Sequence, residues 1–310
     1  MVNTSNQQAD HSTRLVLQPL VTLGDEESER VSASLIHDAV LGKTEMSLLD
    51  CISLQPHHID TPDDLGLAPL HLAVLTDNIE AVRILAEVGV DLTQPTRFRG
   101  ETALHIACYY NREVIAMCLL DLIPCVSSWD GKECTPLHLC RAAPNITRRL
   151  LSLGASLTAR GPYGRTPLRG MVMDDIENDR DCCRDKVETL RAYAEAGADL
   201  DEVHDGWLLL LDAAWITPYL VQPLLELGAN VCARTTPNRQ SLLHILAIRS
   251  WGLRHIRGLP VPLLRGLDPD CLNMSNSTPW QRMEFHTLLN VVTGLYRCTL
   301  GISRRIVLEV

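Results

Sequence analysis

The chain has 310 residues, 46% of them hydrophobic and only 4% aromatic, which is enough for two ordinary domains or one long array with a packed core. Its formal net charge of -10 argues against general nucleic-acid binding. The most apolar run, residues 207–227, contains charged residues and prolines and is too interrupted to span a membrane.

The cysteines and the N-terminus both bear on the cellular compartment. Eleven cysteines, an odd number, include no CxxC pair, and most stand where a small apolar residue would fit. This usage indicates buried free thiols in a reducing compartment. Residues 1–14 lack the basic-then-apolar order of a signal peptide. We therefore expect an intracellular protein that is not secreted, either cytoplasmic or nuclear.

Residues 1–30 are polar and include an acidic cluster, so we expect most of this segment to be disordered. The apolar patch at residues 15–23 either packs on the first folded element or acts as a short docking segment. The folded part is expected to begin near residue 31.

Residues 66–93 contain the clearest structural unit of the chain. An apolar patch at helical spacing (residues 70–74) is followed by a polar break (76–78), a second apolar patch (82–85) and a stop at Gly89. This pattern predicts two short antiparallel helices joined by a turn. Neither helix can bury its apolar face alone, so the unit needs neighbours of the same kind.

The unit recurs along the chain at a nearly constant period. We take as its marker the residue that opens the first helix of each copy: Ser34, Ala68, Thr102, Thr135, Thr166, Leu208, Ser241 and Thr278. The spacings are 34, 34, 33, 31, 42, 33 and 37 residues. The four central copies have strong motifs, whereas the sixth and eighth are weak and are placed by the period.

Residues 135–138 read Thr-Pro-Leu-His, and residues 197–199 read Gly-Ala-Asp. With the period near 33 residues, these motifs resemble the ankyrin-repeat family, in which the first opens a repeat and the second closes it. The resemblance covers about residue 32 to the C-terminus. It implies an all-α solenoid of seven to eight stacked helix-turn-helix repeats with short β-hairpin-like fingers. We expect the array at residues 31–281, with degenerate first and last repeats, and a helical cap at residues 282–310.

The repeat motif has a physical basis. A threonine hydroxyl can cap a helix start, and proline fits the first helical turn because its missing N–H costs nothing there. The second helices are expected to end at glycines with positive φ, namely Gly89, Gly154, Gly197, Gly228 and Gly266. Ile123 occupies this position in the third repeat, where we expect a different turn.

Two repeats are longer than the others. From marker to closing glycine, the fifth repeat has 31 residues (Thr166 to Gly197), against 21 in the second (Ala68 to Gly89). The additional residues fall near 173–184 and, in the seventh repeat, near 250–258. We expect loops on one face, which either bind a partner or are merely solvated.

One histidine recurs at the same position of the motif: His37, His71, His105, His138 and His244. The ankyrin resemblance implies that these side chains tie adjacent repeats together by hydrogen bonds. Repeats stacked about 10 Å apart hold the imidazoles too far apart to share a metal ion, which needs metal–nitrogen distances of about 2 Å. We therefore expect no metal site among them.

The chain has no GxxxxGK(S/T), HExxH or GxSxG motif and no Rossmann glycine pattern after a strand, so we expect no catalytic residue, no bound cofactor and no enzyme activity. Two alternatives remain. The acidic insertion around Cys182 and Cys183 could make a metal- or redox-responsive protein. Residues 241–267 faintly resemble a suppressor-of-cytokine-signalling box in their Leu-Pro-Val-Pro, which would make a ubiquitin-ligase substrate-receptor adaptor.

The ankyrin resemblance also implies where a partner would bind, because finger tips and first helices line a concave groove in that family. The scarce aromatic residues of this chain occur in successive fingers beside cations, and aromatic and arginine side chains often dominate interface energy. The rings either pack back on neighbouring fingers or share a partner groove, and we expect the groove. The candidate residues are Arg97, Phe98, Arg99, Tyr109, Tyr110, Arg112, Trp129, Lys132, Arg160, Tyr163, Arg165, Arg234 and Arg239.

We predict a non-catalytic scaffold or adaptor that mediates protein–protein interaction through this groove. The cationic rim favours an acidic peptide or protein surface as the partner. We expect neither nucleic acid nor a membrane to be bound.

Overall fold

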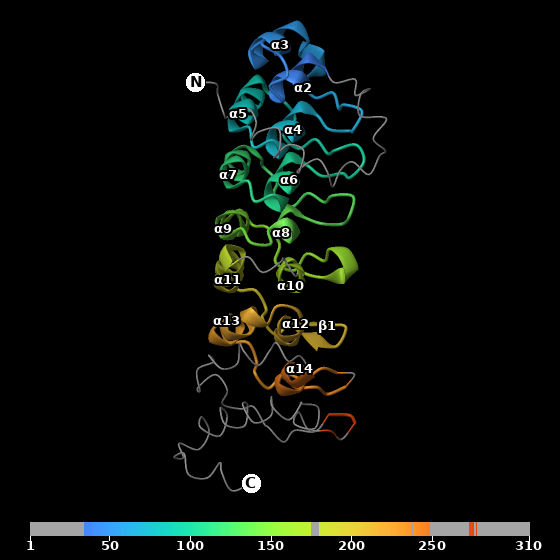
Figure 1. The fold of residues 1–310 in the computed structure, drawn as a ribbon, viewed down its shortest axis with the longest axis vertical. Coiled ribbons are helices and arrows are strands. Elements are labelled where there is room, and N and C mark those ends of the chain that lie inside the picture. The colour runs from blue at the N-terminus through green and yellow to red at the C-terminus, as the bar shows by residue number, and fades with distance from the viewer. Residues whose placement is uncertain (1–33, 175–179, 237, 249–272, 276, 278–310) are drawn as a thin grey trace, which may run out of the picture. The chain divides into compact units, whose positions relative to one another are not determined.

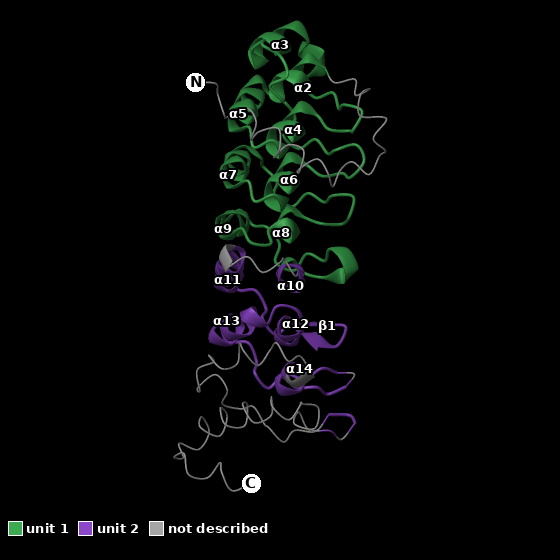
Figure 2. Ribbon diagram, in the orientation of Figure 1, with its two compact units in different colours: residues 1–167 green, residues 168–310 purple. Residues whose placement is uncertain are grey.

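The computed structural model describes residues 34–174, 180–236, 238–248, 273–275 and 277. The chain divides into two compact units, residues 1–167 and residues 168–310, which Figure 2 colours green and purple. Several predicted features lie outside the described residues: the disordered segment (1–30), the second insertion (250–258), the marker of the eighth repeat (Thr278) and the C-terminal cap (282–310).

The described part of the first unit contains four helix pairs. Its first helices are α2 (Leu35–Val40), α4 (Pro69–Leu75), α6 (Ala103–Tyr109) and α8 (Pro136–Leu139). The second helices are α3 (Leu48–Leu54), α5 (Ile79–Val88), α7 (Glu113–Leu122) and α9 (Pro144–Ser152), and short 3-10 helices lie at η1 (Pro56–His58) and η2 (Pro162–Gly164). Each first helix packs on the next first helix and each second helix on the next second helix, which makes two layers (Figure 1).

The helices end where the repeat motif predicts. The predicted closing glycines that the structure describes all have positive φ, namely Gly89 (+89°), Gly154 (+86°), Gly197 (+82°) and Gly228 (+100°). Ile123 departs from this pattern as expected, because it ends α7 in an extended conformation with φ -89° and ψ 126°. The local sequence therefore sets the length of each helix pair.

The core lies between the two layers and between successive repeats. Leu104 and Leu137, one from each of two neighbouring first helices, are each 1% exposed. Burying one such leucine contributes about 2 kcal/mol. Ala73 and Ala107 are fully buried, and their small side chains allow neighbouring first helices to approach closely.

The second unit continues the same pattern with α10 (Pro167–Met173), α11 (Arg180–Glu195), α12 (Leu209–Ile216), α13 (Val221–Glu226) and α14 (Leu242–Ile248). A 3-10 helix, η3 (Pro218–Leu220), precedes α13. The finger before α12 is a two-stranded antiparallel hairpin of β1 (Val203–His204) and β2 (Trp207–Leu208). α12 begins directly after Leu208 and packs on α13 and α14, so the sixth repeat lies where its weak motif was placed by the period.

The first insertion is partly helical, which corrects the prediction of a loop over residues 173–184. Met173 is the last residue of α10, and residues 180–184 belong to α11, which has 16 residues against 10 in α5 and in α7. Two contacts lie in the part of α11 that follows the insertion. The buried Lys186 donates from Nζ to the backbone oxygen of Asp174, and Arg191 pairs with Glu188 at 2.9 Å. The second is an ion pair at helical spacing, which stabilises this part of the helix.

Candidate partner-binding surface

Fingers connect each repeat to the next and project from the ends of the first helices (Figure 1). In the first unit they comprise residues 63–67, 96–101, 130–134 and 161–165. A side-chain oxygen closes three of them, because Asp63, Asp130 and Thr96 accept a backbone N–H from the far side of the finger at 2.8, 2.7 and 3.0 Å. These closures make each finger a defined turn.

Neighbouring fingers touch through their backbones. The N–H of Arg97 donates to the carbonyl of Gly66 (3.0 Å), and the N–H of Gly131 donates to the carbonyl of Arg99 (2.8 Å). A Cβ atom on Gly66 would lie 2.7 Å from the Cβ of Arg97, and one on Gly100 would lie 2.8 Å from the backbone nitrogen of Gly131. Glycine is therefore required in these fingers both for positive φ and for close approach.

Where the histidine recurs, it links its repeat to the chain that follows, as the ankyrin resemblance implied. Its Nε2 lies 3.0–3.2 Å from a backbone carbonyl oxygen. That oxygen belongs to the following finger in His37–Leu67, His105–Cys134 and His138–Arg165, lies just before that finger in His71–Gln94, and in the second unit belongs to Ser277 for His244. A carbonyl only accepts, so Nε2 carries the proton and donates it.

The other ring nitrogen of each histidine is an acceptor. The backbone N–H of Thr102 donates to Nδ1 of His105 (3.2 Å), and the Thr102 hydroxyl lies 2.8 Å from the same nitrogen. That hydroxyl is 3.5 Å from the backbone nitrogen of His105, so the predicted helix cap is the weaker of its two contacts. Burial lowers the pKa of His71 to about 4 and also lowers the pKa of His105 and of His138.

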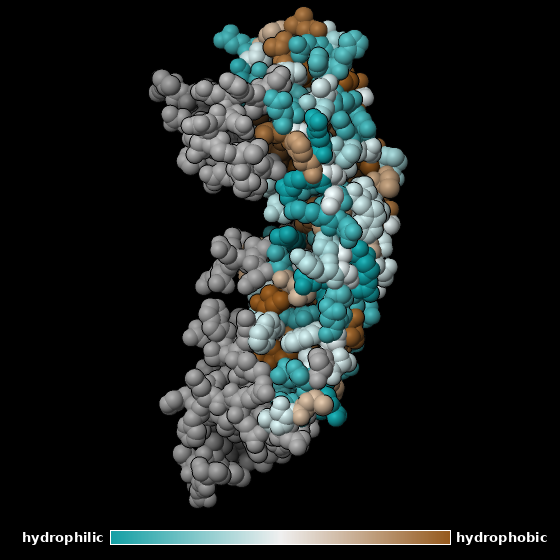
Figure 3. Space-filling model, turned by 90° about the vertical axis from the view of Figure 1, so that its right-hand side faces the viewer, coloured by the Kyte–Doolittle hydropathy of each residue, from teal (hydrophilic) through white to brown (hydrophobic). Residues whose placement is uncertain are grey.

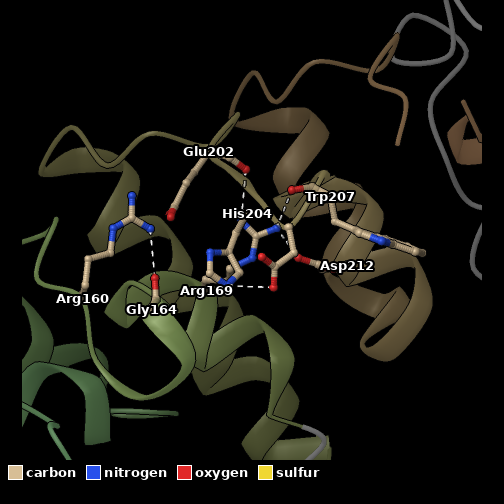
Figure 4. Close-up of polar contacts among 8 residues, drawn as sticks. Arg160, Gly164, Arg169, Glu202, His204, Trp207 and Asp212 are labelled. Carbon is tan, nitrogen blue, oxygen red and sulfur yellow. Dashed lines mark hydrogen bonds and ion pairs between the residues drawn. The ribbon is translucent and has the colours of Figure 1, made fainter. Parts of the chain in front are cut away.

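In the fifth repeat, Arg169 replaces the histidine and makes a larger network (Figure 4). Its guanidinium donates to the carbonyls of Glu202 (3.1 Å) and Trp207 (2.7 Å), and it forms an ion pair with the carboxylate of Asp212. The side chains of Arg169 and Asp212 are 1% and 9% exposed. Asp212 stands where the other repeats described here carry an apolar residue or glycine, except the first, which has Asp38. Arg169 and Asp212 both depart from the motif, and the charge of each is balanced by the other.

The predicted finger-tip rings are exposed, yet each also has a neighbour in the protein. Phe98 is 70% exposed and lies under the guanidinium of Arg97 (5.8 Å). Trp129 is 51% exposed with its ring 6.2 Å from that of His138. Tyr163 is 83% exposed and lies beneath Arg165 (5.2 Å). These rings are therefore exposed to solvent while each also has a contact within the protein, which for Phe98 and Tyr163 is an arginine of the same finger.

A second set of predicted residues gathers where α6 ends. Tyr109, 48% exposed, meets Tyr110 edge-on with ring centres 4.9 Å apart. Arg112 is held by the carboxylate of Asp77 (3.0 Å). Burial raises the pKa of Tyr110 and the neighbouring Tyr109 raises it further, whereas the charge of Arg99 lowers it. Residues of a finger and of a first-helix end therefore share one surface in the first unit.

The remaining predicted cations are distributed over both units. Arg160 is exposed and donates to the carbonyl of Gly164 (3.2 Å, Figure 4), and Lys132 is exposed. Arg234 and Arg239 belong to a finger of the second unit, where Arg239 is exposed with φ +50° and Arg234 forms an isolated β-bridge with Ser241. These two residues are therefore assigned to the second unit alone.

Two residues that sequence reasoning missed are central to these contacts. Arg141 places its guanidinium 5.2 Å from the ring centre of Tyr109 in the preceding repeat, and Arg169 forms the buried network described above. Arg169 could have been found as the one arginine at the histidine position of the motif. Arg141 could have been found because it follows a first helix, as Tyr110 does.

The residues on which the two alternative functions depend are only partly described. Residues 34–174, 180–236, 238–248, 273–275 and 277 contain no group of three His, Cys, Asp or Glu side chains placed to hold a metal ion. Cys182 and Cys183 lie in α11 and are partly exposed. Most of the faint box at residues 241–267 falls outside the described residues.

None of the helices described is long and apolar enough to cross a bilayer.

Comparison with protein families identifies the repeats. A family model for ankyrin repeats (three copies) matches residues 36–123. Human NF-kappa-B inhibitor epsilon is 30% identical over 179 residues, which cover 51% of this chain and 35% of that protein. The mouse B-cell lymphoma 3 protein homolog is 27% identical over 251 residues, which cover 80% of this chain and 46% of that protein. The chain thus spans less than half the length of these two relatives.

Comparison with solved structures supports the fold. The ankyrin repeat domain of human ASB11 has a TM-score of 0.56 at 19% identity, with 74% of this chain and 98% of that chain covered. At this identity the likeness concerns the arrangement of stacked helix pairs and not the activity.

Proposed function

Because this chain belongs to the ankyrin-repeat family, we propose that it is a non-catalytic scaffold or adaptor that binds a protein partner through its fingers and first-helix ends. One observation carries the proposal. The scarce aromatic side chains of the first unit are placed on this surface with large exposed fractions, 70% for Phe98, 51% for Trp129 and 83% for Tyr163. Exposed aromatic side chains beside arginine are the residues that most often dominate protein interfaces.

The mechanism is presentation of a preformed surface. Backbone hydrogen bonds between fingers and the histidine links hold the finger backbones in place before a partner arrives. Little conformational entropy is then lost on binding, which leaves more of the contact energy available for affinity.

The relatives suggest a partner to test first. Human NF-kappa-B inhibitor epsilon is named for its action on NF-kappa-B, and it matches about half of this chain. We therefore propose NF-kappa-B as the first candidate partner for direct pull-down.

The test is affinity purification with mass spectrometry, using wild type and the triple variant Phe98→Ala, Trp129→Ala, Tyr163→Ala as baits. A matched control carries Val114→Ala, Leu122→Ala and Leu153→Ala, which removes exposed apolar side chains from the second-helix layer of the same unit. Circular dichroism establishes that all baits have equal helicity.

We expect at least one partner to be lost from the finger variant and retained by wild type and by the control. Identical partner lists for all three baits would show that the fingers are not the binding surface. Loss from the control variant alone would assign binding to the second-helix layer.

A further inference from the structure

We propose that the apolar stretch at residues 15–23 packs on the first repeat, on the side of α2 and α3 that no described repeat precedes. This side is here called the end surface, and it includes Leu35, Asp38 and Ala39 of α2 and Met46 and Leu49 at the start of α3. The occupant is a segment of the same chain, so the contact closes this end of the array. The inference concerns a different surface from the fingers and stands apart from the proposed scaffold function.

The α2 part of the end surface is open where the other repeats of the first unit are covered. Leu35 is 37% exposed and Ala39 is half-buried. The residues at these two positions in the second, third and fourth repeats are all buried: Pro69, Ala103 and Pro136, and Ala73, Ala107 and Cys140. In each of those repeats the first helix packs on the first helix of the preceding repeat. Among the described elements, α2 has no such cover on this side.

The α3 part of the end surface is apolar where the next repeat is charged. Met46 is 40% exposed and Leu49 is 53% exposed. The first two markers are 34 residues apart, and the residues 34 positions after these two are the exposed Glu80 and Arg83. Exposed apolar side chains at positions that another repeat gives to charged ones indicate a surface that is covered.

The surface hydropathy of the first unit agrees with this difference. Figure 3 shows brown, apolar residues gathered at the upper end of this unit, where Figure 1 places α3. Elsewhere on the face that Figure 3 shows, the described residues are mostly hydrophilic. A terminal repeat whose outer side is polar needs no cover, whereas this repeat keeps apolar side chains there.

Charge on the end surface argues against a second copy of this chain as its occupant. Residues 34–54 contain three acids, Asp38, Glu45 and Asp50, and one base, Lys43. Two copies that met through this surface would bring like charges together, which opposes association. An uncharged apolar segment meets no such repulsion.

Residues 15–23 have the composition and the position that the end surface requires. Six of these nine residues are Leu or Val, and none is charged. Ten residues, 24–33, join the stretch to Ser34, which directly precedes α2. Ten extended residues span up to about 33 Å, whereas helices of six and seven residues, as in α2 and α3, are only about 9 and 10 Å long. The four acids at residues 25–29 belong to this link and not to the stretch that packs.

Attachment to the same chain makes a weak contact sufficient. A short flexible link keeps a segment near its surface at an effective concentration of about 1 mM or more. Burial of a few leucine and valine side chains needs no exact geometry, because the hydrophobic effect is not directional. The contact can therefore persist within one chain even where the same segment as a separate peptide binds weakly.

Photo-crosslinking in the full chain tests where the stretch lies. The probe p-benzoylphenylalanine is introduced in place of Leu20, inside the stretch, and in a second protein in place of Gln8, outside it. Mass spectrometry maps the cross-linked residues, and denaturing gels separate cross-links within one chain from those between chains. We expect the probe at position 20 to cross-link to residues 35–54 of its own chain at least about fivefold more often than the probe at position 8.

Variants of the end surface test whether the cross-link depends on this contact. Leu49→Arg gives the first repeat the type of residue that the second carries at Arg83, so the fold should tolerate it. We expect it to lower the yield of the cross-link from position 20 at least about threefold, because a charge then replaces an apolar contact. The matched control is Val114→Arg, which introduces the same charge at a residue of α7 that is 64% exposed and should leave the yield unchanged. Circular dichroism establishes that all variants have equal helicity.

Four results would each overturn the proposal. Cross-links mainly to the fingers at residues 63–67 and 96–101 would place the stretch on the surface proposed for the partner. Cross-links between chains would make a second copy the occupant. A yield from position 20 that does not exceed the yield from position 8 would show that the stretch has no preferred surface. Equal yields in wild type, Leu49→Arg and Val114→Arg would show that the end surface does not hold it.

Discussion

Gly89 and Gly100 both have positive φ, but for different structural reasons. Gly89 ends a second helix with φ +89°, and a Cβ atom there would have no neighbour within 4 Å. Gly100 lies in a finger with φ +64°, and a Cβ atom there would lie 2.8 Å from the backbone nitrogen of Gly131. Backbone conformation alone requires the first glycine, whereas backbone conformation and contact between fingers together require the second.

This difference predicts unequal effects of the same substitution. Gly89→Ala should lower the free energy of unfolding by about 1 kcal/mol, the cost of a left-handed alanine. Gly100→Ala should lower it by about 3 kcal/mol, since overlap with the neighbouring finger adds to that cost. Urea unfolding followed by circular dichroism measures both. Equal effects would mean that the fingers are not in backbone contact.

Arg169, which stands at a histidine position of the motif, changes how the β1–β2 hairpin is attached to the preceding repeat. In five repeats a neutral imidazole bonds backbone carbonyls in or just before the next finger, whereas Arg169 bonds the carbonyls of Glu202, directly before β1, and of Trp207 in β2, and pairs with Asp212. A buried charge requires a buried partner, so the change at residue 169 and the change at residue 212 depend on each other.

A double-mutant cycle tests this dependence at the scale of the hairpin and its repeat. Arg169→Met leaves the Asp212 carboxylate buried without its ion-pair partner and should cost about 3–5 kcal/mol of stability. The single variant Asp212→Leu leaves Arg169 buried without this carboxylate, and the double variant Arg169→Met, Asp212→Leu removes both charges. Its stability should return to within about 1 kcal/mol of wild type, as the measured urea midpoints would show. Strictly additive losses in the double variant would contradict the proposed compensation.

The long helix α11 includes residues that were predicted to form a loop. The excess length of the fifth repeat predicted a loop near residues 173–184, between its two helices. The helix nevertheless begins at Arg180, with Lys186 buried and bonded to the backbone oxygen of Asp174. That contact joins residues 12 positions apart, so no local pattern contains it.

At the scale of the whole molecule, the histidine links make stability depend on pH. The folded state keeps His71, His105 and His138 neutral, because burial lowers the pKa of each ring. In the unfolded chain these rings bind protons near pH 6.5. Between pH 6.5 and the lower folded values the unfolded state binds more protons, so acid favours unfolding there.

We therefore expect the free energy of unfolding to decrease as pH falls from 7 to 5, a window above the ordinary titration of carboxylates. For His71, whose folded pKa is about 4, the full effect by pH 4 is roughly 3 kcal/mol. Urea midpoints at a series of pH values measure the trend. The variant His71→Gln is the control and should show a shallower slope. A flat profile for wild type between pH 7 and pH 5 would show that the rings have the same pKa in the folded and the unfolded state.

The sequence by itself determined the repeat register, the helix pairs and the histidine links. Five repeats carry the histidine and five carry a closing glycine, and these residues act within one repeat or on the segment that leads into the next. Even the weak sixth copy was placed by the period, and α12 begins where the period required.

Only the tertiary structure decided which side chains meet. Arg169 and Asp212 are 43 residues apart, and Arg141 reaches Tyr109 across a repeat boundary. Such contacts depend on the distance and rotation between stacked repeats, which no single repeat encodes. For the same physical reason, the sequence could name the aromatic and cationic candidates of the binding surface, whereas the stacking selected Tyr109, Tyr110 and Arg141 as the group that lies together.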